Sequence, residues 1–376
     1  MKKSLILLSY DYPPNDGGIS RLTAAFATEL AAKNIHIELC TLKEESIEQG
    51  LARPNLPTVE LSRTKGKREI GLLRYLISKS KQAQFITTVW NPEGTLAWLL
   101  GHHNLYILAH GNEVMPYPTT RKYLLKSILR KKVLLSARCV ICNSHYTEQL
   151  VKDIDTNIKT TVVNPGVDYE RFNTSITKLQ ACQELGLATD KRILLSVSRV
   201  DEYKGHDVVL NALASLPKIE LEQVQYVVAG KGRHLDTLKQ LAVELGVSEN
   251  ITWLGFVNDE QLPKLYKAAD LFSLCTREDK QQRGVEGFGM VFLEAQASGL
   301  PVIGTDAGGI SDAISHGEGG WLIDQDDSQE LMGYIKKLIN SPDIISEQGK
   351  LGSKRIHNSC TWRHYTNDLL TVLEKY

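Results

Sequence analysis

Two glutamates eight residues apart flank one apolar segment, and the segment between them could bind an anion. The segment is Glu286-Gly-Phe-Gly-Met-Val-Phe-Leu-Glu294. A helix that begins near Gly289 would leave Glu286 in the preceding loop and place Glu294 about one and a half turns inside. The first amides of such a helix and its partial positive charge suit a phosphate group. Carboxylate, amides and carboxylate in this order suit a nucleotide sugar, although two glutamates at this spacing also occur by chance.

Arg199 and Lys204 supply the positive charges that a diphosphate would need. They lie in Ser198-Arg-Val-Asp-Glu-Tyr-Lys-Gly-His206, where a predicted strand ends and a helix begins. Across such a loop the two side chains can converge on one diphosphate, the guanidinium through paired hydrogen bonds and the ammonium as a point charge. Two solvated surface cations are the alternative interpretation of the same pattern.

Glycines follow two of the predicted strands. Gly17 and Gly18 end a turn-rich loop after the first strand and precede a helix predicted over residues 22–33. Adjacent glycines let the backbone approach a ligand closely, and the helix start can hold an anion, but a Gly-Gly turn also occurs for structural reasons alone. Gly230 and Gly232 resemble half of a dinucleotide fingerprint whose third glycine is absent.

The elements that must position these residues are two series of apolar runs, each run of strand length and separated from the next by a helix-like segment. Such runs are typical of parallel strands buried on both faces. The runs span residues 4–9, 35–42, 85–90, 105–110, 139–143 and 161–163, then 192–198, 226–230, 251–255, 271–275, 301–305 and 320–323. We expect two doubly wound domains, 1–170 and 171–359, with residues 168–190 as a linker and a helix at about 360–376 packing back on the first domain.

Composition is that of an average folded protein. With 42% apolar residues, 23% charged residues and 28 glycines among 376, the chain is neither collagen-like, nor disordered, nor a disulfide scaffold. Lysine plus arginine equals aspartate plus glutamate at 44 each, so we expect no nucleic-acid partner. No apolar run suits a secretory signal or a membrane span, and we expect a cytoplasmic protein. Cys139 and Cys142 have redox or zinc spacing, but a buried strand explains them without a metal.

Positive charge is concentrated in one part of the first half. Residues 61–138 hold 14 lysines and arginines against three glutamates. Within them, Arg121-Lys-Tyr-Leu-Leu-Lys-Ser-Ile-Leu-Arg-Lys-Lys-Val-Leu-Leu is predicted to form a helix that mixes cations with apolar side chains. We expect peripheral contact with the inner face of an anionic membrane through Arg121–Lys132. The alternative is a helix whose apolar stripe packs on its own domain.

Taken together, these motifs resemble glycosyltransferase family 4, whose members have the GT-B fold, use nucleotide sugars and retain the anomeric configuration. The resemblance covers most of the chain. Its elements, in family order, are Gly17-Gly18, Ala109-His110-Gly-Asn-Glu113, Asn143-Ser144, Asn164-Pro-Gly-Val-Asp168, Arg199 with Lys204, Gly230-Lys-Gly232, Gly255-Phe256-Val257, and Glu286 with Glu294. The segments around His110, Glu286–Glu294 and Thr305-Asp-Ala-Gly-Gly-Ile are most similar to mannosyltransferases that act on phosphatidylinositol and related lipids.

The resemblance implies two Rossmann-like domains facing an interdomain cleft, and it implies a role for each matched residue. Arg199 and Lys204 would neutralise the departing diphosphate. Glu286 would hold sugar hydroxyls, Glu294 the ribose, and His110 would contact the transferred sugar, although a strand-end histidine bonded to backbone is an alternative for His110. The other donor-binding residues that it implies are Gly17, Gly18, Gly230, Phe256, Val257, Phe288, Gly289, Met290 and Val291. It implies no metal and no cofactor besides the substrate nucleotide sugar.

We therefore expect a retaining, metal-independent hexosyltransferase of cell-envelope glycan or polysaccharide biosynthesis. Its donor would be GDP- or UDP-linked, with mannose as the first hypothesis, and its acceptor a glycan or lipid-linked precursor. The alternatives are a transferase that uses a UDP-sugar and a soluble acceptor, a GT-B phosphorylase, a catalytically silent sugar-nucleotide binder, and a nicotinamide-dependent oxidoreductase. The last lacks the glycine fingerprint after its first strand.

Overall fold

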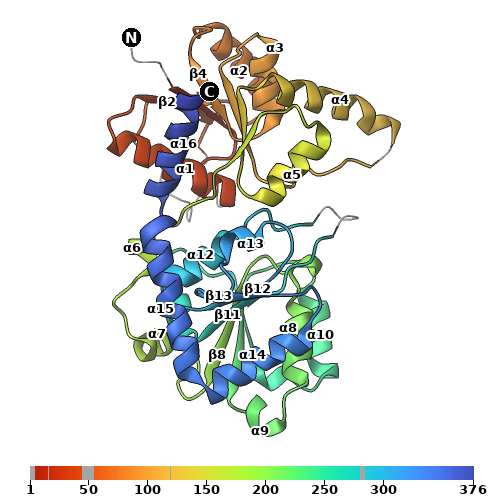
Figure 1. Ribbon diagram of the computed structural model, residues 1–376, viewed down its shortest axis with the longest axis vertical. Helices are drawn as coiled ribbons and strands as arrows, with labels where there is room; N and C mark the ends of the chain where they lie inside the picture. Colours follow the sequence, from red (N-terminus) through yellow and green to blue (C-terminus); the bar gives the residue numbers. More distant parts are fainter. Residues whose placement is uncertain (1–4, 16, 45–54, 119, 280–283) are drawn as a thin grey trace. The chain divides into compact units, whose positions relative to one another are not determined.

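The computed structural model describes residues 5–15, 17–44, 55–118, 120–279 and 284–376, and the chain divides into two compact units. Unit 1 is Met1–Gly166 together with Trp362–Tyr376, and unit 2 is Val167–Thr361. Each unit is built on one parallel sheet with helices around it (Figure 1). The expectation of two doubly wound α/β domains is confirmed. The division falls four residues before the expected boundary at 170, and the return to unit 1 falls two residues after the expected boundary at 359.

The sheet of unit 1 has the order β3-β2-β1-β4-β5-β6-β7, so the direction of strand addition reverses between β1 and β4. Its strands are β1 (Leu5–Ser9), β2 (Ile37–Leu42), β3 (Thr58–Leu61), β4 (Gln84–Thr87), β5 (Leu105–Ala109), β6 (Cys139–Cys142) and β7 (Thr160–Val162). Strand β3 was not predicted, because this short edge strand is mostly exposed and carries no apolar run. Cys139 and Cys142 are buried in β6, as a structural strand predicts.

The last helix of the chain belongs to unit 1. Its helices are α1 (Gly18–Ala32), α2 (Lys67–Ile77), η1 (Trp90–Gly94), α3 (Thr95–Leu99), α4 (Arg121–Ser136), α5 (His145–Ile154) and α16 (Trp362–Lys375). Helix α16 lies beside α1 (Figure 1), where the Tyr365 ring is 6.2 Å from that of Phe26. The side chains of Gln84 and Tyr106 donate to the Leu373 carbonyl at the same place. The core of unit 1 therefore includes residues from both ends of the chain.

The sheet of unit 2 has the order β10-β9-β8-β11-β12-β13, with the reversal between β8 and β11. Its strands are β8 (Arg192–Val197), β9 (Val224–Ala229), β10 (Ile251–Gly255), β11 (Leu271–Leu274), β12 (Val302–Thr305) and β13 (Gly320–Ile323). Ile193 and Leu195 lie in one buried cluster, whereas Leu194 lies in another. Because successive side chains of a strand point to opposite faces, β8 is buried on both faces, as its uniformly apolar sequence predicts.

The expected linker at residues 168–190 is wrong, because this segment is an integral part of unit 2. It forms α6 (Tyr169–Phe172) and α7 (Lys178–Leu185), and Phe172, Ala181 and Cys182 are buried in the core. The other helices of unit 2 are η2 (Glu202–Lys204), α8 (His206–Ala214), α9 (Lys218–Leu221), α10 (Leu235–Glu244), η3 (Ser248–Asn250), α11 (Leu262–Ala268), α12 (Met290–Ala297), α13 (Ile310–Ala313), α14 (Ser328–Asn340) and α15 (Pro342–Ser359). No helix among the described residues of either unit has the length and hydropathy that a membrane crossing needs.

Candidate active site

The carboxyl ends of β8 and β11 lead into the cations and carboxylates that the sequence singles out in unit 2. These neighbouring strands flank the reversal of strand order, where open α/β sheets bind ligands. Lys204 follows β8 and Glu286 follows β11, and Lys204 Nζ is 2.6 Å from Glu286 Oε2. Burial of Lys204 opposes its charge, but the Glu286 carboxylate outweighs this effect, so the pKa of Lys204 is raised. The site therefore holds a buried ammonium ion in contact with a carboxylate.

Arg199 is the exposed member of the cation pair. Its side chain is 71% exposed, with Nη1 2.9 Å from Asp201 Oδ2 and Nη2 donating to the Tyr203 hydroxyl at 3.0 Å. The Lys204 ammonium lies 5.0 Å from the centre of the same Tyr203 ring. Both predicted phosphate-binding cations therefore contact Tyr203, a residue that sequence reasoning missed because it lies between them without a motif of its own.

Close backbone packing and one arginine position this loop. Gly205 has φ +69°, and a Cβ there would lie 1.8 Å from the Cys275 carbonyl oxygen, so glycine is required. The Arg277 amide donates to the Tyr203 carbonyl at 2.7 Å, while its guanidinium donates to both carboxylate oxygens of Asp207 at 2.8 and 2.6 Å and also contacts Asp326. These hydrogen bonds to Asp207, despite partial burial, raise the pKa of Arg277. Arg277 belongs to no motif, and only its contacts in the fold reveal its role.

Helix α12 begins where the sequence predicts and presents amides and a carboxylate. Gly289, at φ +92°, immediately precedes it, and the amides of Gly289, Met290 and Val291 donate to no other described residue. Glu294 is 9% exposed and accepts a hydrogen bond from the Tyr266 hydroxyl at 2.8 Å. Tyr266, on α11, was not predicted.

Three other predicted donor-binding residues, Phe288, Phe256 and Val257, differ in how far their side chains are exposed. Phe288 is only 3% exposed and packs in the core, so its backbone alone could face a ligand. Phe256, after β10, is 53% exposed, whereas Val257 is half-buried and packs against the core. Of these side chains, Phe256 is therefore the one most available to a donor.

Close packing of the backbone explains why positions 230 and 232 are glycines, without any role in binding a ligand. A Cβ on Gly230 would lie 1.7 Å from the Ser198 carbonyl oxygen, and one on Gly232 would lie 2.1 Å from that of Val200. The two glycines therefore let the loop after β9 pack directly on the loop that carries Arg199. Gly230 also donates its amide hydrogen to the Gly255 carbonyl at 2.6 Å.

In unit 1, His110 follows β5 and is held by backbone groups. Its Nε2 donates to the Thr88 carbonyl at 3.0 Å, and its amide donates to Glu113 Oε1 at 2.5 Å. This contact matches the alternative interpretation of His110 as a strand-end histidine bonded to backbone. Gly17, at the carboxyl end of β1, precedes α1 in an extended conformation, and Gly18 is the exposed first residue of that helix.

Sequence reasoning missed Glu93, which lies where the strand order of unit 1 reverses. It follows β4, is 1% exposed, and accepts the amide of Tyr10 at 3.0 Å on Oε1, whereas the structure provides no hydrogen-bond donor for Oε2 among the described residues. Burial raises the pKa of Glu93 to about 7. The signal available in the sequence was a single acid in Trp90-Asn-Pro-Glu-Gly94, between an apolar strand and an apolar helix.

Arg130 is a structural residue of α4 and not an exposed cation. It is 4% exposed, donates to the Met115 carbonyl at 2.8 Å, and its guanidinium lies 4.3 Å from the centre of the Tyr117 ring. It also contacts the carbonyl of Glu113, whose carboxylate accepts the amide of His110. Arg130 therefore connects α4 to the loop that carries His110, and it must be removed from the set of residues expected to meet a membrane.

Within the described ranges, no three or more histidine, cysteine, aspartate or glutamate side chains gather in a geometry that could hold a metal ion. Asp324 and Asp326 have the spacing of a metal ligand pair in the sequence. In the structure Asp326 contacts Arg277, and the neighbouring Asp327 caps α14 by accepting the amide of Glu330 at 2.8 Å. Asp326 and Asp327 therefore have structural partners.

Comparisons with known proteins agree with the fold, and they define the chain as a glycosyltransferase. Residues 16–171 match the family described as Glycosyltransferase Family 4, and residues 178–355 match the family described as Glycosyl transferases group 1. Together the two matches span most of both units. The chain belongs to glycosyltransferase family 4.

Two proteins of similar sequence and one solved structure of similar fold illustrate the match. A GDP-mannose-dependent alpha-(1-6)-phosphatidylinositol monomannoside mannosyltransferase of Mycolicibacterium smegmatis is 26% identical over 96% of this chain and 95% of its own. A D-inositol 3-phosphate glycosyltransferase of Corynebacterium jeikeium is 28% identical over 80% of this chain and 74% of its own. The solved structure of a sucrose-phosphate synthase from Thermosynechococcus elongatus has a TM-score of 0.79 at 22% identity, covering 99% of this chain and 98% of that one, and shows the shared fold.

Proposed function

We propose that this glycosyltransferase moves mannose from GDP-mannose to a hydroxyl group of a lipid-linked acceptor on the cytoplasmic face of a membrane, with retention of configuration. The observation that carries the proposal is the similarity along 96% of the chain to an enzyme named for GDP-mannose and a phosphatidylinositol mannoside. The buried Lys204–Glu286 pair beside the amides of Gly289 to Val291 supports a diphosphate-sugar donor.

The reaction would depend on positioning and electrostatic stabilisation. As the bond between sugar and diphosphate breaks, negative charge develops on the leaving phosphate, and Arg199 and Lys204 would stabilise it. Glu286 would accept hydrogen bonds from sugar hydroxyls, and Glu294, oriented by Tyr266, would accept from the ribose. In a reaction that retains configuration without an enzymic nucleophile, the departing phosphate would take the proton of the acceptor hydroxyl on the same face. Neither a metal nor a cofactor is required by this scheme.

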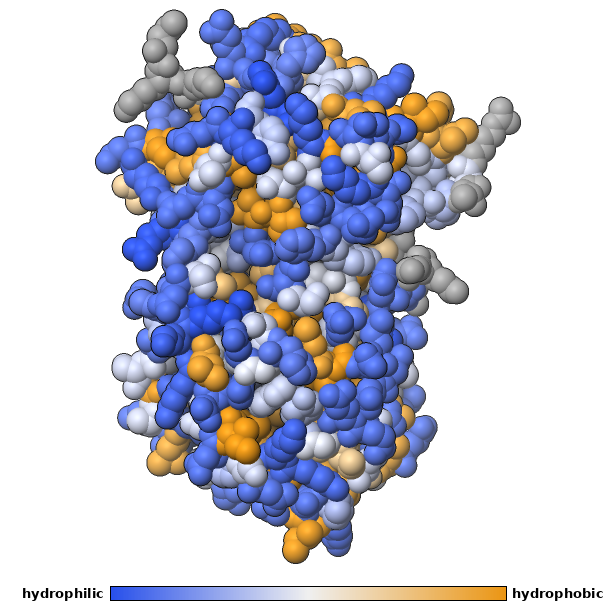
Figure 2. All heavy atoms as spheres, in the orientation of Figure 1, coloured by the Kyte–Doolittle hydropathy of each residue, from blue (hydrophilic) through white to orange (hydrophobic). Residues whose placement is uncertain are grey.

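Helix α4 supports the membrane part of the proposal. Leu124, Leu125 and Ile128 are 59%, 76% and 46% exposed, and exposed Lys126 and Lys132 lie on the same helix. In Figure 2 an apolar patch lies over the α4 region, next to hydrophilic side chains. Exposed leucines beside lysines suit the interface of an anionic bilayer. Lys131 instead pairs with Asp155 at 2.7 Å, and the side chains of Arg121 and Lys122 lie outside the described residues.

The donor and acceptor are tested together with radiolabelled GDP-mannose, UDP-glucose and UDP-N-acetylglucosamine. Each donor is incubated with vesicles that contain phosphatidylinositol or, separately, with soluble inositol 3-phosphate. We expect transfer from GDP-mannose into the lipid phase. Transfer to the soluble acceptor alone would favour the second candidate, which the similarity to the inositol 3-phosphate enzyme supports. Transfer from a UDP-sugar and none from GDP-mannose contradicts the proposed donor.

Vesicle sedimentation tests the membrane contact. Lys126→Glu/Lys132→Glu should abolish binding to anionic vesicles at low salt, because about 1 kcal/mol per engaged lysine is lost and repulsion replaces it. The matched control, Lys33→Glu/Lys43→Glu, makes the same charge change at exposed positions near α1 and β2 in the other half of the unit 1 sheet. Equal binding of the two variants would remove α4 from the proposal.

A further inference from the structure

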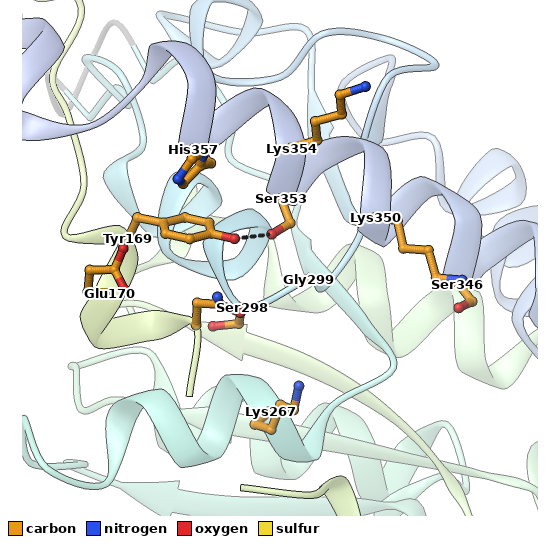
Figure 3. A pocket seen from close by; sticks show the side chains of 11 residues that line it. Tyr169, Glu170, Lys267, Ser298, Gly299, Ser346, Lys350, Ser353, Lys354 and His357 are labelled. Atoms are coloured by element: carbon orange, nitrogen blue, oxygen red, sulfur yellow. Dashed lines mark hydrogen bonds between the residues drawn. The ribbon is translucent and has the colours of Figure 1, made fainter. Parts of the chain in front are cut away.

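Unit 2 contains a polar pocket of about 800 Å³ that the proposed reaction does not use. It lies between α6, α11, the end of α12 and α15 (Figure 3). Its lining residues are Tyr169, Glu170, Asn173, Lys267, Ser298, Gly299, Ser346, Lys350, Ser353, Lys354 and His357. The pocket is broad and largely open to solvent, with room for a small organic ligand. Helix α12 separates it from the donor-binding residues, since Gly289 precedes the first turn and Ser298 follows the last.

The lining carries an excess of positive charge against the trend of the unit. Residues 167–361 hold 20 lysines and arginines and 28 aspartates and glutamates, a net charge of −8. The pocket nevertheless combines Lys267, Lys350 and Lys354 with Glu170 as its single acid. None of these three lysines forms an ion pair with a described residue. By contrast, Lys264 on the same helix as Lys267 pairs with Glu184 at 2.5 Å.

The lysines and hydroxyls come to the pocket from two sides. Ser346, Lys350, Ser353 and His357 are spaced at four, three and four residues, which places them on one face of α15. In Figure 3, Lys267 extends from α11 towards the space below that face, and Lys350 extends from α15 towards it. The hydroxyl groups of Tyr169 and Ser353 are 3.2 Å apart and the Tyr169 ring packs edge-on against His357, so one wall is ordered.

The end of α12 does not require these cations. Its carbonyl groups at Glu294 and Gln296 accept the amides of Ser298 and Gly299 at 3.2 and 3.0 Å, and Ser298 Oγ adds a hydrogen bond to Glu294. Gly299, at φ +78°, completes this local cap. The helix terminus therefore does not occupy these lysines. In Figure 3 Lys267 and Lys350 extend towards the pocket, whereas Lys354 extends away from it.

We propose that this pocket binds a phosphate monoester that carries hydroxyl groups. Lys267 and Lys350 bind the phosphate dianion as point charges from opposite sides. The hydroxyls of Ser298, Ser353 and Tyr169 and the Asn173 amide supply hydrogen bonds to the polyol part. A phosphate monoester fits better than a carboxylate, because its two charges match two lysines. The site is distinct from the donor site and does not depend on the identity of the donor or acceptor.

Calorimetric titration of the full chain at low ionic strength tests the site, with sn-glycerol 3-phosphate as the probe and glycerol as its uncharged match. We expect binding of the ester and none of glycerol. Lys267→Gln/Lys350→Gln should weaken binding at least tenfold. The control Lys218→Gln/Lys239→Gln makes the same charge change at exposed positions of α9 and α10 and should leave binding unchanged. Lys204→Ala should also leave it unchanged, which separates this site from the donor site.

Sedimentation with vesicles that contain phosphatidic acid shows whether the phosphate monoester that the pocket binds is a lipid headgroup. Loss of vesicle binding in Lys267→Gln/Lys350→Gln would assign the site to a lipid, and retained vesicle binding together with loss of the soluble ester would assign it to a free metabolite. Two results would overturn the proposal: no binding of glycerol 3-phosphate and no vesicle binding sensitive to the lysines, or ester binding that Lys204→Ala removes and the pocket variant does not.

Discussion

Glu93→Gln should stabilise unit 1 at pH 8 and leave it unchanged near pH 4. The carboxyl group of Glu93 is buried, with a pKa of about 7 in the folded protein against 4.5 in the unfolded chain. Because the folded state keeps a proton that the unfolded state loses, the stability contributed by this group is complete below pH 4.5 and is lost as the pH rises through 7. At about 1.4 kcal/mol per pH unit, the loss amounts to about 3 kcal/mol.

Glutamine removes this loss because it stays neutral at every pH and keeps an oxygen for the Tyr10 amide. The stability gained by the variant over the wild type should therefore grow from near zero at pH 4.5 to about 3 kcal/mol at pH 8. For a unit of this size, that gain corresponds to an increase in melting temperature of about 6 to 12 °C.

Differential scanning calorimetry at half-unit pH steps measures this difference, since comparison with the wild type at each pH cancels the titration of all other groups. Glu29→Gln, at a partly exposed position of α1, is the matched control for the loss of one carboxyl group from unit 1. A Glu93→Gln curve parallel to that of the wild type, or a variant that is less stable at pH 8 than at pH 5 relative to the wild type, would refute a buried carboxyl that titrates near neutrality.

Four further outcomes follow from the site. Arg199→Ala or Lys204→Ala should lower turnover about 10² to 10³-fold, measured by product formation at saturating donor, and turnover of both within threefold of the wild type would contradict their role. Glu294→Ala should weaken calorimetric binding of the bare nucleotide, whereas Glu286→Ala should spare the nucleotide and weaken the nucleotide sugar; equal losses would contradict the assignment. Activity should survive EDTA and give a retained anomer by NMR. Finally, His206 is buried between the hydroxyls of Tyr226 and Ser198 at 2.9 and 3.0 Å, and burial lowers its pKa to about 4. Stability should therefore fall by up to about 3 kcal/mol as the pH drops from 6.5 to 4, and His206→Gln should not show that fall in the same melts.

The strands and the start of α12 could be predicted because their signals are local. A strand buried on both faces must be apolar along its length, and Gly289 with the apolar run after it marks a helix start without reference to any other segment. The edge strand β3 and the short helices α6 and α7 lack such signals. One face of α7 is buried only because Phe172 and the core of unit 2 surround it.

The partners of the site residues could not be predicted, because they come from distant parts of the chain. Tyr266 reaches Glu294 from another helix, and Arg277 reaches Asp207 across 70 positions. Arg130 illustrates the same limit in the opposite direction. Its sequence neighbours are lysines, which favoured an exposed position, whereas the carbonyls of the loop after β5 bury it. The pattern of charges along a helix therefore did not distinguish an exposed cation from a buried one that donates hydrogen bonds to a neighbouring loop.

The position of α16 in unit 1 has a consequence for synthesis of the chain. Tyr365, Leu369, Val372 and Leu373 fill the core beside Phe26, yet they leave the ribosome after all 195 residues of unit 2. At about 5 to 20 residues per second, unit 1 therefore waits about 10 to 40 s with that part of its core uncovered, while unit 2 emerges as one uninterrupted block. The half of the enzyme that is translated first is thus the half that is completed last.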